Sequence, residues 1–227
     1  MKKITHLFFY LSLLSAVFHA NAGVIIGGTR VLYEGTKKEA SINLNNPDKI
    51  PYLVQSWVEN EAGTREGIPF IATPPLFRLD AGQQNVLRIV NTGSLPDDKE
   101  SLYWLNIKTI PSLQTQPGEN TLQIAVKTRI KLIYRPSKLS GRMPESVANE
   151  LKWAVSGNKV SVTNPTNFYM HFSSIKVAEK SVDNPTYVAP GATKTFEMIS
   201  QADKNGTITW QLINDYGGVS KKFTSTY

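Results

Sequence analysis

The clearest hydrophobic pattern in the chain lies between residues 122 and 136, where apolar and polar side chains alternate. The apolar positions of one parity are Leu122, Ile124, Val126, Ile130, Leu132 and Tyr134, and the polar positions of the other parity are Gln123, Lys127, Arg129 and Lys131. This period of two predicts one β-strand from 122 to 134. Strands average about 5–6 residues, so a strand of this length is expected to extend beyond its own core. Its first three apolar residues would then be free to bind a partner, although the same alternation is also typical of an ordinary core strand.

Short runs rich in β-branched and aromatic residues recur on both sides of this segment. They cover residues 24–33, 52–58, 86–90 and 102–107 in a first series, and 160–162, 168–172, 193–196 and 207–213 in a second. Clusters of Gly, Pro, Asn and Asp separate them, and no long helical periodicity is present. In the last run Ile208, Trp210 and Leu212 alternate with polar residues, as in a half-buried strand. The spacing predicts an all-β protein of the sandwich type.

A polar stretch between the two series predicts a linker. Residues 136–149 are interrupted by Pro136, Gly141 and Pro144. A chain of this size can form two cores of about 100 residues each. We therefore expect two consecutive domains, 23–140 and 141–227.

The first 22 residues have the plan of a secretory signal peptide. Lys2 and Lys3 precede an apolar run at 7–18, and Ala20-Asn21-Ala22 is a small-x-small cleavage site. The apolar run is too short for a spanning helix, which needs about 20 residues. Removal of residues 1–22 would leave a mature chain from Gly23, and a bacterial signal of this type predicts the periplasm. The chain has no cysteine, so stability in an oxidising compartment must come from packed cores.

Charge narrows the choice of partner only slightly. The formal charge of +7 falls to +5 when Lys2 and Lys3 leave with the signal. A basic surface of this size suits DNA, anionic lipid or a carboxylate-bearing partner, and is often only a solvated face. Because no dense run of Lys and Arg occurs, we expect no nucleic-acid partner.

The composition also argues against an enzyme. Without cysteine, and with His171 as the one histidine outside the signal, neither a Cys/His pair nor a usual zinc site can form. His171 lies within the run 168–172 and is expected to face outward from a strand. No nucleophile elbow, phosphate loop or dinucleotide fingerprint occurs, and Gly27-Gly28 is better interpreted as a break in a strand. We expect no catalysis, no metal and no cofactor, which leaves binding as the function.

Seven motifs occur in an order that resembles one family. They are Gly28–Tyr33, Tyr52–Asn60, Thr73–Pro75, Glu100–Asn106, Tyr134–Pro136, Asn164–Thr166 and Ile213–Gly218. Together they resemble the periplasmic pilus-assembly chaperones of the chaperone/usher pathway, the PapD-like family, over residues 23–218. The resemblance implies two immunoglobulin-like domains at an angle, with a cleft between them and no enzymatic activity. It also implies binding of pilus subunits by donor-strand complementation and their delivery to an outer-membrane usher.

The same resemblance implies roles for eight residues. They are Arg30 and Lys131 as the anchor for the subunit carboxylate; Leu122, Ile124 and Val126 as the donor strand; and Glu100, Arg135 and Asp215 as an interdomain ion network. Strict alternation places Lys131 on the face opposite Val126. Strand twist, a bulge or the bend between domains would have to re-aim the lysine.

Two further expectations concern this segment, one from the resemblance and one from its exposed apolar edge. The connector of residues 111–120 is short, which resembles the branch with a short F1–G1 loop, and an exposed apolar edge favours capping by a second copy of the chain. The alternative is a β-sandwich fimbrial subunit or adhesin. The two-domain length and the absence of cysteine argue against that alternative.

Overall fold

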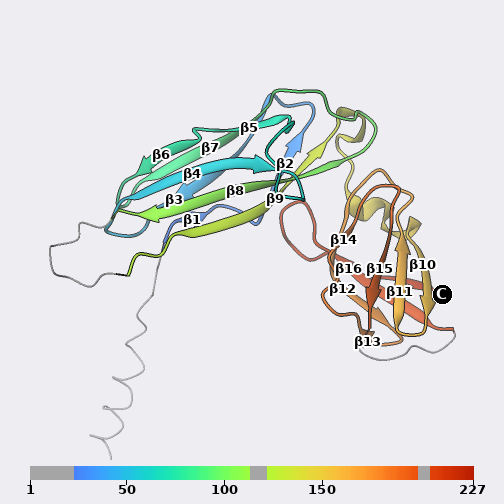
Figure 1. Ribbon diagram of the computed structural model, residues 1–227. Coiled ribbons are helices and arrows are strands. Elements are labelled where there is room, and N and C mark those ends of the chain that lie inside the picture. The colour runs from blue at the N-terminus through green and yellow to red at the C-terminus, as the bar shows by residue number, and fades with distance from the viewer. Residues whose placement is uncertain (1–22, 113–121, 199–204) are drawn as a thin grey trace, which may run out of the picture.

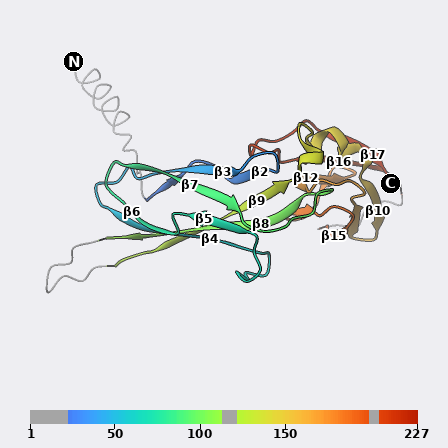
Figure 2. The same cartoon turned by 90° about the horizontal axis from the view of Figure 1, so that it is seen from above.

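The computed structural model describes residues 23–112, 122–198 and 205–227. Two β-sandwiches form separate lobes that meet at an angle (Figures 1 and 2), and each has its own hydrophobic core. The predicted all-β, two-sandwich fold is confirmed. The predicted signal peptide, and most of the connector that suggested a short-loop branch, lie outside the described residues. Within those residues, no helix is long and apolar enough to cross a membrane.

The first domain packs a four-stranded sheet on a five-stranded sheet. The four-stranded sheet has the order β1 (Ile25–Ile26), β3 (Glu39–Asn45), β7 (Gln84–Asn91) and β5 (Phe70–Thr73). The five-stranded sheet has the order β2 (Arg30–Glu34), β9 (Val126–Arg135), β8 (Ser101–Pro111), β4 (Tyr52–Glu59) and β6 (Leu76–Leu79). Alternate residues of each sheet, such as Leu44, Leu87, Leu105 and Leu132, are fully buried between them. This alternation is the physical basis of the period-two pattern in the sequence.

The chain changes sheets at its start, so the single run expected at 24–33 is in fact two strands. β1 pairs antiparallel with β3, whereas β2 pairs parallel with β9, with Arg30 opposite Lys131. The crossing occurs at Gly27 and Gly28. A Cβ atom on Gly27 would lie 3.1 Å from the Asn43 carbonyl oxygen, closer than a side chain normally fits. The glycine therefore permits the close approach that the crossing needs.

Strand β9 is shorter than the sequence predicted, because it begins at Val126 and not at Leu122. Its pairing with β8 is regular from Val126 opposite Thr109 to Tyr134 opposite Ser101. On its other side, β2 pairs with β9 only from Lys131 onward. Among the described residues, no strand covers this second side from Val126 to Ile130. Residues 122–125 pair with no strand among the described residues, so they are not assigned to one.

The second domain has a three-stranded sheet and a five-stranded sheet. The first has the order β10 (Lys152–Ser156), β11 (Lys159–Thr163) and β15 (Thr193–Glu197). The second has the order β13 (Lys180–Ser181), β12 (Met170–Val177), β16 (Thr207–Leu212) and β17 (Phe223–Thr226), with β14 (Tyr187–Val188) also pairing with β12. Ile208, Trp210 and Leu212 are buried, and the alternation predicted for this strand is confirmed.

The stretch interpreted as a linker contains structure of its own. Two 3-10 helices, η1 (Ser137–Leu139) and η2 (Pro144–Glu150), follow β9. Leu139, Val147 and Ala148 are buried in the core of the second domain. The segment therefore connects the two domains and also packs against the second.

Candidate functional site

Arg30 and Lys131 lie side by side where the two domains meet. They are paired positions of the parallel strands β2 and β9, and their neighbours Val31 and Leu132 occupy the first core. The two cations therefore face away from that core. Across the domain boundary, Lys131 Nζ lies 3.1 Å from His171 Nδ1, and Arg30 Nη1 donates to the Ile213 carbonyl oxygen at 3.3 Å. The first domain supplies these two cations, and the second supplies the acceptors that hold them.

Three cations, Arg30, Lys131 and Lys194, lie close together at this partly buried site. Burial, with smaller contributions from the charges of Arg30 and Lys194, lowers the pKa of Lys131 to about 8. Burial also lowers the pKa of Arg30, which Asp215 partly opposes. The ammonium groups of Lys131 and Lys194 lie 5.2 and 4.9 Å from the ring centre of Tyr187. Cations that destabilise one another in this way favour an anion, because it would relieve their repulsion. Sequence reasoning missed Lys194 and Tyr187, since nothing in their local pattern separates them from other residues of the second domain.

His171 corrects an expectation, because it is 3% exposed and does not face outward. Its ring stacks on Tyr169 and packs against Tyr187. Burial, together with the charges of Lys131 and Arg30, lowers the pKa of His171 to about 2, so the imidazole is neutral at ordinary pH. A lysine ammonium only donates hydrogen bonds, so the Nδ1 atom must be the unprotonated acceptor and Nε2 carries the proton.

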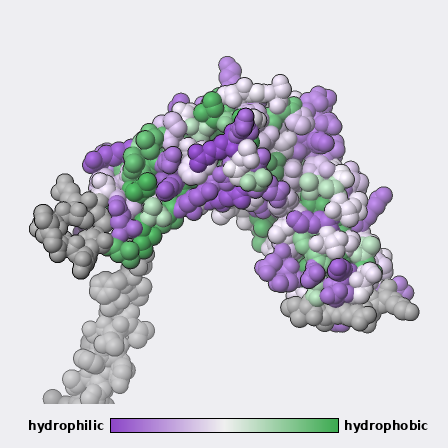
Figure 3. All heavy atoms as spheres, viewed as in Figure 1, coloured by the Kyte–Doolittle hydropathy of each residue, from purple (hydrophilic) through white to green (hydrophobic). Residues whose placement is uncertain are grey.

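The three predicted donor residues are exposed in this structure. Leu122, Ile124 and Val126 have 82%, 64% and 53% of their surface exposed. Ile124 and Val126 line a hollow of about 230 Å³, together with residues such as Ile26 and Tyr52. Apolar surface gathers at this end of the first domain in the space-filling view (Figure 3), beside the atoms drawn in grey. An apolar end of this kind on a folded domain is typical of a site that a partner covers.

Val126, the one predicted donor residue within β9, and Lys131 lie on opposite faces of that strand. Pairing with β8 advances one residue at a time from Val126 to Lys131, without a register shift. The bulge considered from the sequence is therefore absent from this segment. The unpaired edge of β9 lies between the two faces, and it ends at the Arg30–Lys131 pair, where β2 begins.

Glu100, Arg135 and Asp215 form an ion network that joins the domains. The guanidinium of Arg135 donates to Glu100 Oε1 at 2.8 Å and to both carboxylate oxygens of Asp215 at 2.7 Å. Glu100 also accepts a hydrogen bond from the Tyr169 backbone N–H at 2.7 Å. Burial raises the pKa of the Glu100 carboxyl, an effect that Arg135 and the Tyr169 N–H oppose. Glu100 and Arg135 are almost fully buried, so the network is shielded from solvent.

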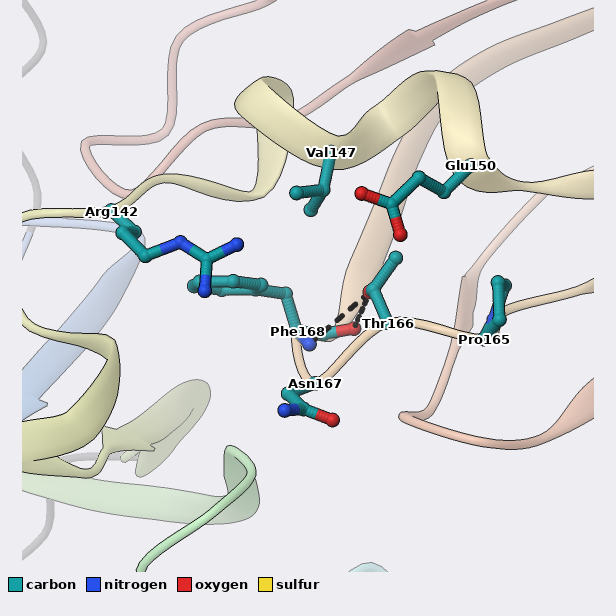
Figure 4. Close-up of a pocket in the computed structure, with 7 residues that line it drawn as sticks. All are labelled: Arg142, Val147, Glu150, Pro165, Thr166, Asn167 and Phe168. Atoms are coloured by element: carbon teal, nitrogen blue, oxygen red, sulfur yellow. Dashed lines mark hydrogen bonds between the residues drawn. The ribbon is translucent and has the colours of Figure 1, made fainter.

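A small polar pocket of about 140 Å³ lies beside this network in the second domain (Figure 4). Arg142 and Glu150 are among its lining side chains, and the Arg142 guanidinium lies over the Phe168 ring at 5.5 Å. The Arg142 carbonyl oxygen accepts a hydrogen bond from Arg135. Neither Arg30 nor Lys131 lines this pocket. In the described ranges, no group of three or more His, Cys, Asp or Glu could hold a metal ion.

The fold and the open edge define a two-domain immunoglobulin-like protein with one incompletely covered sandwich. The chain belongs to the pilus-assembly chaperone family: residues 23–140 match the pili and flagellar-assembly chaperone PapD N-terminal domain, and residues 146–224 match the pili assembly chaperone PapD C-terminal domain.

Individual relatives agree with this assignment. The probable fimbrial chaperone LpfB of Escherichia coli O157:H7 is 42% identical over 205 residues, covering 89% of this chain and 88% of the relative. A chain in the solved complex of the Salmonella enterica SafA pilin with the SafB chaperone has a TM-score of 0.82 and 40% identity, covering 92% of this chain and 99% of that one. The solved periplasmic chaperone SfaE has a TM-score of 0.71 and 33% identity, covering 89% and 98%.

Proposed function

We propose that this protein is a periplasmic chaperone that holds a pilus subunit at the open edge of β9 and anchors the subunit's terminal carboxylate between Arg30 and Lys131. The observation that carries the proposal is that the unpaired edge from Val126 to Ile130 ends at the two cations. Backbone groups on such an edge are free to pair with an added strand. The signal-like N-terminus and the periplasmic chaperone SfaE support the compartment.

The geometry favours one direction for the bound strand. Strand β2 already occupies the edge from Lys131 onward, so an added strand must stop there. If its carboxylate lies at Arg30 and Lys131, the added strand runs in the same direction as β9. An added strand lies in the plane of the sheet, between its two faces. Its C-terminal carboxylate can therefore reach Arg30 and Lys131, while its side chains contact the predicted donor residues on the other face. No re-aiming of the lysine is then needed.

Exposed apolar residues would supply much of the affinity. Burying Leu122, Ile124 and Val126 in a subunit groove would contribute about 1.5–3 kcal/mol each, before the cost of ordering the segment. An apolar groove alone discriminates poorly between registers, and a slip of one residue turns every side chain to the wrong face. The anchored carboxylate would fix the register, because five residues from Val126 to Lys131 span about 17 Å of strand.

The remaining roles follow from the family. Glu100, Arg135 and Asp215 are proposed to fix the angle between the domains, since Arg135 of the first domain binds Asp215 of the second. The domain boundary is proposed to lie near residue 140. The held subunit would be delivered to an outer-membrane usher, and a second copy of the chain would cap the β9 edge when no subunit is bound. This function requires neither catalysis nor a cofactor.

The anchor is tested by co-expression with a subunit from a neighbouring gene. Arg30→Ala and Lys131→Ala should each abolish co-purification of the subunit, while circular dichroism and thermal unfolding remain those of a folded protein. Lys127→Ala is the matched control, because Lys127 lies on the same face of β9 and is exposed. Normal co-purification by either anchor variant would show that the carboxylate assignment is wrong.

A further inference from the structure

The acceptors that hold the two anchor cations are neighbours in the second domain. The Ile213 backbone N–H donates to the His171 carbonyl oxygen at 2.7 Å. Ile213 in turn accepts from Arg30, and the His171 ring contacts Lys131. Arg30 and Lys131 are themselves paired positions of β2 and β9. The four residues are therefore linked in a ring. Backbone pairing joins Arg30 to Lys131 in the first domain and Ile213 to His171 in the second. Side-chain contacts join Arg30 to Ile213 and Lys131 to His171 across the boundary.

The chemistry of the imidazole distinguishes His171 from an ordinary core residue. Its Nδ1 atom faces the Lys131 ammonium, and its Nε2 atom is buried with no hydrogen-bond partner among the described residues. A phenyl ring of similar size would pack between Tyr169 and Tyr187 without burying an unsatisfied N–H. Packing alone therefore does not account for histidine at this position. The property that a phenyl ring lacks is an acceptor for Lys131.

Lys131 needs such an acceptor because its surroundings repel it. Burial, Arg30 and Lys194 all disfavour its charged form, and the rings of Tyr187 and Trp104 lie 5.2 and 5.9 Å from its ammonium group. A flexible lysine in this field would move its ammonium group away from Arg30. A hydrogen bond to a neutral imidazole holds it in place, and a lysine ammonium has three donors, so two remain for a bound anion.

We propose that His171 is a positioning residue for the carboxylate anchor, through which the second domain keeps the Lys131 ammonium beside Arg30. The inference deepens the proposed function and rests on it. It also makes the anchor a shared product of both domains, because Lys131 then points correctly only when the second domain is docked.

The test uses purified mature protein and a synthetic heptapeptide of alternating valine and threonine, prepared with a free C-terminal carboxylate and as the C-terminal amide. Isothermal titration calorimetry measures both peptides with wild type, His171→Phe and His171→Asn. Wild type should prefer the free acid. His171→Phe should bind the acid about tenfold more weakly and the amide unchanged, since one hydrogen bond to a charged group is lost. His171→Asn, whose side-chain oxygen can replace Nδ1, should retain affinity for the acid within about threefold.

The outcomes separate this inference from the proposed function. Equal binding of acid and amide by wild type would overturn the carboxylate anchor itself. A wild-type preference that His171→Phe retains in full would overturn only the positioning role, and so would equal losses in the Phe and Asn variants. If the variants fold poorly, the tautomer of His171 can be measured in the wild-type protein instead. A long-range proton–nitrogen NMR spectrum at pH 7 should show the His171 proton on Nε2, and a proton on Nδ1 would overturn the inference.

Discussion

The two halves of strand β9 share one alternating pattern but lie in opposite environments. Val126 is 53% exposed beside an uncovered strand edge, whereas Leu132, of the same parity, is fully buried between β2 and β8. The pattern of side chains is the same in both halves, and only the neighbours differ. If the proposed function is right, stability and subunit binding depend on separate segments of one strand, with Lys131 at the junction.

The largest effect is expected at the end of the buried half, in Arg135→Ala. This change leaves the buried carboxylate of Glu100 without its cation and removes the bond to Asp215. Breaking one partner of a buried network typically costs about 3–5 kcal/mol. Urea unfolding monitored by fluorescence should show a loss of this size in the free energy of unfolding.

A matched control is the exposed pair of Lys138 and Asp97, which lies 2.5 Å apart with both side chains in solvent. Lys138→Ala should leave the free energy of unfolding nearly unchanged, because exposed ion pairs contribute little. If Arg135→Ala were as mild as Lys138→Ala, the network would not hold the domains together.

The next effect compares the buried half of β9 with the exposed segment just before the strand, through Leu132→Ala and Ile124→Ala. Truncating a buried leucine usually costs about 2–5 kcal/mol, whereas truncating an exposed side chain changes stability by less than about 0.5 kcal/mol. We expect the order to reverse for subunit capture, where Ile124→Ala weakens binding and Leu132→Ala acts only through loss of folded protein. Denaturation and co-purification of the same two variants measure both quantities. A large loss of stability in Ile124→Ala would place that side chain in the chaperone's own core.

Local alternation predicted much of the fold. Strands such as β4, β7, β8 and β16 were predicted to within a few residues, because one of their faces packs on a core. The start of β9 was predicted too early, since alternation reports which side chains are apolar and not whether a neighbouring strand is present. Short or edge strands such as β5, β13 and β14 were missed, because two to four residues carry too little pattern.

The predicted site depended on a family resemblance, and the structure added residues that neither the pattern nor the resemblance supplied. His171, Lys194 and Tyr187 come from the second domain, 40 or more positions from Lys131. Their proximity to Lys131 depends on the angle between the domains, which no periodicity encodes. His171 was expected to face outward because a lone histidine in a strand is polar. Tertiary packing overrode that preference by placing the second domain against Lys131.

The smallest expected effect is a pH dependence at the junction of the two halves. A carboxylate requires Lys131 in its ammonium form, and in the folded protein its pKa is about 8, below the ordinary 10.5. The unfolded chain therefore binds more protons between about pH 8 and 10.5, so this group opposes folding at neutral pH, and its opposition fades as the pH rises through that window. Binding of a carboxylate should instead weaken as the pH rises through this window, because the ammonium form is lost.

Below about pH 8 the Lys131 ammonium is present, and binding of the free-acid peptide should be constant. Above about pH 8, affinity should fall by up to about tenfold, or 1.4 kcal/mol, per pH unit.

The groups that face Lys131 do not obscure this transition. His171 is already neutral because its pKa is lowered to about 2, burial raises the pKa of Tyr187, and Arg30 remains charged. Lys194 is the other titratable neighbour, and the profile of Lys194→Met would isolate its contribution. Lys131→Arg is the decisive variant, because a guanidinium stays protonated and should flatten the profile. A fall above pH 8 that persists in Lys131→Arg would assign the titration to another group.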